Sequence, residues 1–139
     1  MWLKTEDYRP YIGERILALV SEADDVVRAM AENAAIEEVS GYLRAKYDTK
    51  KIFEEYDPER RNPMLIQVLV HVTLNNLYAS MPNKLGAEAR SERYESAIAW
   101  LSEVRDGRLQ VDLPLIESDT DKPHNGFAVN MMKKNRYQW

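Results

Sequence analysis

The sequence predicts an all-α fold: a small helical bundle of about four helices with a short C-terminal strand and an extended C-terminal arm. First, residues 64–81 are apolar nearly all round, which is typical of a helix buried on most sides. Second, a later stretch repeats apolar residues at steps of three and four, as on one helix face: Tyr94, Ala97, Ile98, Leu101 and Val104. Third, Asn62-Pro63 is a helix start signal, and Asp106-Gly107 supplies the left-handed position that ends a helix. We therefore divide the chain into a helical domain, residues 1–116, and a mobile C-terminal arm, residues 117–139.

The N-terminal third predicts two short helices before a long one. Thr5-Glu6-Asp7 is a cap followed by acidic first-turn residues, and Gly13-Glu14 opens a second brief helix. Ser21 to Asp24 resembles a capping box, so a long helix is expected from there to about Tyr47. Its expected inner face is Val27, Met30, Ala34, Val39, Leu43 and Tyr47. Gly41 within it costs about 1 kcal/mol against alanine, which suggests close packing there.

The rest of the helical domain is read in the same way. In the charged connection 48–61, the apolar residues Ile52, Phe53 and Tyr56 predict a short helical turn folded over the core. The last helix is expected from about Gly86 to Asp106. After it, residues 108–113 alternate between polar and apolar, the pattern of a half-buried strand, with Leu109, Val111 and Leu113 on the apolar side.

The C-terminal arm differs from the body in composition and charge. From Lys122 onward there are four basic residues and no acidic one, so a chain of net charge −4 has a body, residues 1–121, of charge −8. The basic residues are Lys122, Lys133, Lys134 and Arg136. An acidic body argues against a general nucleic-acid-binding surface. The arm either docks onto an acidic neighbour or is solvated. Its last residues, which include Phe127, Tyr137 and Trp139, are apolar enough to pack on this subunit or the next.

Composition excludes several classes of function. At 139 residues the chain forms one domain, and without cysteine it has no disulfide, thiolate chemistry or cysteine-ligated zinc. No run of about 18 apolar residues and no signal peptide occurs, so we expect neither membrane insertion nor secretion. Two isolated histidines, His71 and His124, and five scattered glycines provide no metal site and no phosphate loop. We expect no catalytic residues, no metal and no cofactor.

Several individual residues admit more than one interpretation. His71 is expected to be a hydrogen-bonded core or interface histidine. Asn75 and Asn76 are expected to bond a neighbouring helix end, with a subunit contact as the alternative. Trp100 is either a second core contact or an interface anchor. The carboxylate pairs Glu37-Glu38 and Glu54-Glu55 are interpreted as solvated faces.

Four strings in order resemble the Mu-like prophage head-tail connector (neck adaptor, head completion) family. Residues 5–14 resemble its "TPEDL…FGE" opening, and residues 35–47 its "AEIDGYLAARY" helix. Pro63 stands where its third helix starts, and residues 93–113 resemble its "RYEDAIKWL…GKISL" string. The connection 48–61 is more charged than expected for the family, and the C-terminal segment lacks a clear copy of the family's ending.

The resemblance implies a structural, non-enzymatic adaptor that binds the portal protein as a ring and joins the head to a tail-side neck protein. It implies self-association, dodecameric when assembled, at the virion neck, and a location in the bacterial host's cytoplasm before assembly. Neither a membrane nor sequence-specific nucleic acid is an expected partner. The expected interface residues are Trp100, Phe127, Lys133, Lys134, Arg136, Tyr137 and Trp139. The alternative is a small helical DNA-binding regulator, which requires a basic reading helix.

Overall fold

The computed structural model describes residues 1–79 and 87–117, and these residues form helices without a sheet. A short 3-10 helix, η1, spans Thr5–Tyr8. The α-helices are α1 (Glu14–Val20), α2 (Asp25–Leu43), α3 (Thr49–Phe53), α4 (Pro63–Tyr78) and α5 (Ala87–Arg105). The predicted all-α bundle is therefore confirmed.

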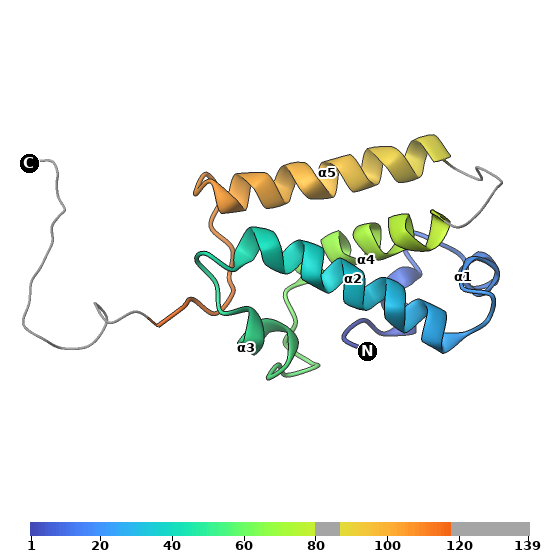
Figure 1. Cartoon of the computed structure of the whole chain (residues 1–139), viewed down its shortest axis with the longest axis horizontal. Helices are drawn as coiled ribbons and strands as arrows, with labels where there is room; N and C mark the ends of the chain where they lie inside the picture. Colours follow the sequence, from blue (N-terminus) through green and yellow to red (C-terminus); the bar gives the residue numbers. More distant parts are fainter. Residues whose placement is uncertain (80–86, 118–139) are drawn as a thin grey trace, which may run out of the picture.

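Helix α4 lies at the centre of the fold, as predicted. It packs against both α2 and α5, and η1 also contacts it (Figure 1). Nine of its residues are buried, and they occur on all sides of the helix. The helix begins where the sequence indicated, because Asn62 Oδ1 accepts the backbone N–H groups of Met64 and Leu65 at 2.9 and 3.0 Å and Pro63 follows it.

Helix α2 is capped by the last residue of the predicted capping box, Asp24, and not by its first, Ser21. The helix also presents a different face to the core than predicted. Its cap is Asp24, whose side chain accepts the Val26 N–H at 2.8 Å, while the Ser21 hydroxyl donates back to the Leu17 carbonyl. Of the predicted inner face, Val39, Leu43 and Tyr47 are buried, but Met30 and Ala34 are exposed. Ala35 and Glu32 are buried in their place.

Gly41 was expected to allow close packing, but nothing lies within 4 Å of the position that a Cβ would occupy there. In contrast, Gly107 does end α5 in the left-handed conformation, with φ of 81°. Helix α3 confirms the expected helical turn, with Ile52 and Phe53 buried.

The predicted strand at residues 108–113 does not form. The chain makes a turn after α5 and then runs past the α2–α3 connection, which it meets in one isolated antiparallel bridge between Tyr47 and Leu115. The alternating pattern of Leu109, Val111 and Leu113 has no strand to pair with, because the neighbouring segments are helices and a short turn. Among the described helices, none is both long and apolar enough to cross a membrane.

Candidate functional site

The N-terminal residues 1–4, which we call the N-terminal strap, are bonded to the helical body. Trp2 and Leu3 are buried, and their backbone N–H groups donate to Glu32 Oε1 at 2.6 Å and Oε2 at 3.3 Å. The Trp2 indole N–H donates to the Ile52 carbonyl at 2.9 Å, and the ring packs edge-on against Phe53. The strap therefore joins α2 to α3.

Arg61 fixes the strap from the other side. Its Nη1 donates to the Trp2 carbonyl at 3.0 Å and to Asp7 Oδ2 at 2.6 Å, and its Nη2 donates to Asp7 Oδ1 at 3.3 Å. Its Nε donates to the Pro58 carbonyl at 3.0 Å. Both side chains of the ion pair are largely buried. A single guanidinium thus connects η1, the strap and the α3–α4 connection.

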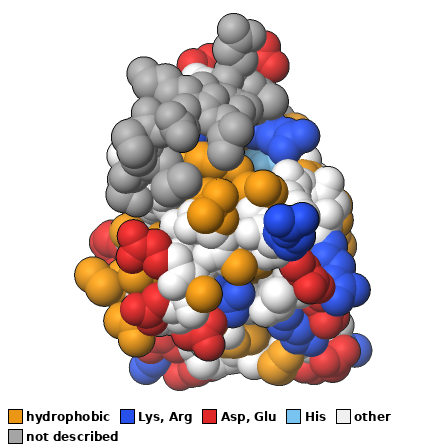
Figure 2. Space-filling view, turned by 90° about the vertical axis from the view of Figure 1, so that its right-hand side faces the viewer, with side chains coloured by type: hydrophobic (Ala, Val, Ile, Leu, Met, Phe, Trp, Pro, Cys, Tyr) orange, Lys and Arg blue, Asp and Glu red, His pale blue; other side chains and the backbone are white. Residues whose placement is uncertain are grey.

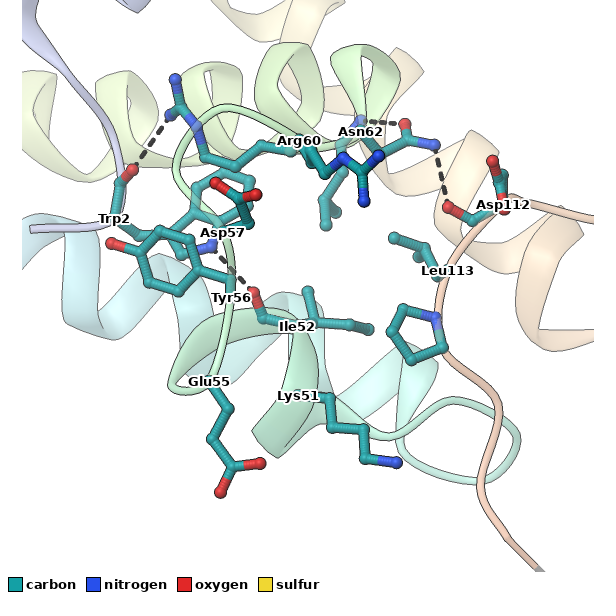
Figure 3. A pocket seen from close by; sticks show the side chains of 13 residues that line it. Trp2, Lys51, Ile52, Glu55, Tyr56, Asp57, Arg60, Asn62, Asp112 and Leu113 are labelled. Atoms are coloured by element: carbon teal, nitrogen blue, oxygen red, sulfur yellow. Dashed lines mark hydrogen bonds between the residues drawn. The ribbon is translucent and has the colours of Figure 1, made fainter.

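A pocket of about 280 Å³ lies beside the strap (Figure 3). Its apolar lining is Trp2, Ile52, Tyr56, Leu65, Leu113 and Pro114. Lys51, Glu55, Asp57, Arg60 and Asp112 place charges around it. Arg60 forms no ion pair within the described part of the chain, and Figure 3 shows its guanidinium directed toward the pocket. The arrangement suits an apolar side chain, and charges of both signs surround it.

One wall of this pocket belongs to residues 111–117, which we call the arm root because the predicted arm follows them. The Pro114 carbonyl accepts the Asp48 N–H at 2.8 Å, and the Ile116 N–H donates to the Lys46 carbonyl at 3.1 Å. The Val111 N–H donates to the hydroxyl of buried Tyr47 at 3.2 Å. These bonds fix the arm root to the α2–α3 turn.

Trp100 is the one predicted interface residue within the described part of the chain. It is partly buried and packs against the core, so the structure shows a core contact and leaves part of the indole accessible. The other predicted interface residues lie outside the described residues: Phe127, Lys133, Lys134, Arg136, Tyr137 and Trp139. The predicted interface as a whole therefore stays a prediction.

His71 is buried, but its Nδ1 has no hydrogen-bond partner among the described residues. It lies edge-on to Tyr11, with ring centroids 4.7 Å apart, beside a second hollow of about 450 Å³ that Arg93 also lines. Burial lowers the pKa of His71, and the positive charge of Arg93 lowers it further. The imidazole of His71 is therefore neutral at pH 7. The prediction that this side chain is fully hydrogen-bonded is wrong at Nδ1.

Asn76 and three of the four paired glutamates have structural partners. Asn76 donates to the Ala31 carbonyl of α2 at 3.1 Å, which is the predicted kind of contact, although it reaches the middle of the helix and not its end. Glu38 accepts the Tyr94 hydroxyl at 2.5 Å, and this hydrogen bond, together with burial, raises the pKa of Tyr94 to about 12. Glu37 pairs with Arg44 and Glu55 with Lys50 on the surface.

Sequence reasoning missed the two residues on which the strap depends, Glu32 and Arg61. A signal for Glu32 exists, because it precedes Ala35, Val39 and Leu43 at helical spacing on the buried row of α2. No comparable signal marks Arg61. Within residues 1–79 and 87–117, no group of three or more His, Asp or Glu side chains could hold a metal ion.

A comparison with known protein families finds a match over most of the chain. The family model described as "Bacteriophage Mu, Gp36" matches residues 6–130, which include nearly the whole described body and continue into the arm. No curated protein and no solved structure matches the chain. Since the match covers most of the sequence, the chain belongs to the Bacteriophage Mu Gp36 family and is a Mu-like phage protein of the structural or assembly-related kind.

Proposed function

We propose that the chain is a structural head-tail connector that binds the portal protein as a ring and joins the phage head to a tail-side neck protein. The observation that carries the proposal is the family match over residues 6–130, which extends from the helical body into the arm. The role requires no catalytic residue, metal or cofactor. Its place of action is the virion neck, after the subunits accumulate in the bacterial cytoplasm.

The physical arrangement supports such a role. The body is a helical unit whose N-terminal strap is fixed by Glu32 and Arg61, so it can present a constant shape to neighbours. The arm root is bonded to this body at Asp48 and Lys46. Residues 118–139 start from a fixed point and carry aromatic and basic side chains that suit an acidic partner surface.

The DNA-binding alternative receives less support from the helices. The three longest helices carry net charges of −3 for α2, zero for α4 and −1 for α5. A reading helix in the major groove lies among phosphates and is typically basic. We therefore favour protein partners over nucleic acid.

A reconstitution experiment tests the proposal. The full chain is mixed with the portal protein of the same phage, and binding is followed by co-sedimentation and by electron microscopy of the particles. We expect stoichiometric binding and a ring of subunits, dodecameric, on one face of the portal. The tail-side neck protein should then bind the complex and not the free portal. If the chain binds duplex DNA and ignores the portal, the alternative is correct.

A matched pair of variants sharpens this experiment. Trp100→Ala removes the one predicted interface residue that the structure describes, and Tyr42→Ala removes another partly buried aromatic that packs against the core. We expect Trp100→Ala to weaken portal binding or ring formation more than Tyr42→Ala does when both variants remain folded. Equal effects mean that Trp100 is only a core contact.

A further inference from the structure

Exposed large hydrophobic side chains gather at two opposite ends of the molecule. One end, which we call the α1–α2 end, exposes Ile16, Leu19, Val26 and Met30. The other, the arm-root end, exposes Leu109, Leu115 and Ile116. Figure 1 shows α1 and the start of α2 at one end of the bundle and residues 106–117 at the other. These are seven of the nine large hydrophobic side chains that are exposed within the described residues.

The exposure at both ends is large. Val26 and Met30 are 65% and 67% exposed, and they lie one turn apart on the same side of α2. Leu115 is 59% exposed. Figure 2, which views the molecule from the α1 side, shows hydrophobic side chains among both Asp or Glu and Lys or Arg side chains on that face. Grouped apolar side chains on a soluble protein's surface mark an interaction site more often than scattered ones do.

The two ends offer charges that can pair with each other. At the α1–α2 end, Glu22, Asp24 and Asp25 are exposed, and residues 14–30 carry a net charge of −2. At the arm-root end, residues 106–117 carry −2, whereas the neighbouring α2–α3 turn, residues 44–51, carries +3 and exposes Arg44, Lys46, Lys50 and Lys51. The carboxylates at the α1–α2 end are complementary to the basic α2–α3 turn that adjoins the apolar side chains of the arm-root end.

We propose that the α1–α2 end of one subunit packs against the arm-root end of a second copy of the chain. The two surfaces differ, so the contact is heterologous, and repeating it produces a closed ring when the rotation per subunit closes. A contact between two α1–α2 ends would instead bring acidic surfaces together and is disfavoured by repulsion. The inference rests on the ring assembly proposed above and names the surfaces that form it.

Cysteine crosslinking tests the contact directly, because the chain has no cysteine of its own. Two full-length variants, Met30→Cys and Leu115→Cys, are treated with a short bismaleimide, first separately and then as a mixture. Both positions are exposed, so neither change should disturb the fold. Met30 and Leu115 lie at opposite ends of the bundle, so the reagent cannot join them within one subunit. Ala99→Cys, at an exposed position of α5, replaces one partner in the control mixtures.

We expect severalfold more crosslinked dimer in the mixture of Met30→Cys and Leu115→Cys than in either variant alone or in mixtures with Ala99→Cys. The yield should fall with added salt, because the attraction between the two ends is screened. Predominant crosslinking of Met30→Cys or Leu115→Cys with itself would show a like-with-like contact and overturn the inference, as would equal yields in all mixtures or no crosslink at all. The portal is absent from this experiment, so a negative crosslinking result overturns only the contact between copies. Portal binding is tested separately by the reconstitution described above.

Discussion

Glu32 is the residue whose surroundings depart furthest from what its type prefers. It is 1% exposed, and a carboxylate is almost never buried to that extent without partners. Burial raises the pKa of Glu32, whereas the hydrogen bonds from the Trp2 and Leu3 backbone, the N-terminal ammonium group and Arg28 act in the opposite direction. The desolvation is the largest of these effects. Glu32 therefore fixes the strap at an electrostatic cost.

This environment predicts how stability depends on pH. Because the folded-state pKa of Glu32 is raised, the folded protein binds more protons between the unfolded value near 4.5 and the raised value. The contribution of Glu32 to the free energy of unfolding therefore falls as pH rises through that window. It is fully present at pH values below the unfolded pKa. We expect wild type to gain stability relative to Glu32→Gln when the pH is lowered from neutral to about 4.5. Urea unfolding at both pH values measures this; a difference that does not change with pH would show that the pKa of Glu32 is not raised.

Gly41 offers a second residue-scale prediction. It lies inside α2 with open space around its Cβ position, so Gly41→Ala should raise the free energy of unfolding by about 0.5–1 kcal/mol through helix propensity and a less flexible unfolded chain. Gly107→Ala is the matched control. Gly107 has a φ of 81°, and alanine there should destabilise the protein. Thermal melting of both variants is sufficient, and a loss of stability in Gly41→Ala would indicate a neighbour at that position.

At the scale of single elements, sequence periodicity located the helices better than it oriented them. Helix α4 is apolar nearly all round, so its burial could be predicted without deciding which of its faces points to the core. Helix α2 required a choice, and both Met30 and Ala35 belong to rows with helical spacing. The structure buries the row that contains Glu32, because the strap supplies N–H partners to that carboxylate. A contact between residues 30 positions apart is not visible in a local pattern.

The assignment of buried and exposed helix faces can be tested by replacing single side chains with alanine. Leu69 on α4 and Leu101 on α5 are fully buried, as predicted, while Ile98 is only partly buried. We expect Leu69→Ala and Leu101→Ala each to lower the free energy of unfolding by about 2–5 kcal/mol. Val26→Ala, at an exposed position of α2, should change it by less than about 0.5 kcal/mol. A large loss in Val26→Ala would mean that the α2 face is assigned wrongly.

The α3–α4 connection contributes to stability through Arg61. Lysine retains the charge but cannot reach both Asp7 oxygens, the Trp2 carbonyl and the Pro58 carbonyl at once. We expect Arg61→Lys to lower the free energy of unfolding by about 1–3 kcal/mol, since buried acceptors lose their donors. Arg60→Lys is the adjacent control and should have little effect, because Arg60 is exposed. Urea midpoints of the two variants separate these outcomes.

At the scale of the whole molecule, the sequence predicted the helical body but little of the candidate site. The pocket arises where the strap, the connection after α3 and the arm root meet, so its residues come from three distant segments. The prediction of a strand at residues 108–113 was wrong because a strand needs a neighbouring strand from a distant segment, and the neighbouring segments are helices. Predictions from local motifs were confirmed where the bonding partners are close in sequence, as for Asn62, whose side chain caps the N–H groups of Met64 and Leu65.

The division between body and arm leads to the last prediction. Deleting residues 118–139 leaves every described bond of the arm root in place, including those to Asp48 and Lys46, and it leaves the buried residues of the described core unchanged. We therefore expect the shortened chain to keep its helical circular dichroism and to melt close to the full-length protein. Portal binding or self-association should weaken, because the aromatic and basic side chains of the arm are gone. Melting and sizing of both proteins decide between the outcomes. If the shortened chain unfolds, residues 118–139 belong to the core and cannot act as a separate arm.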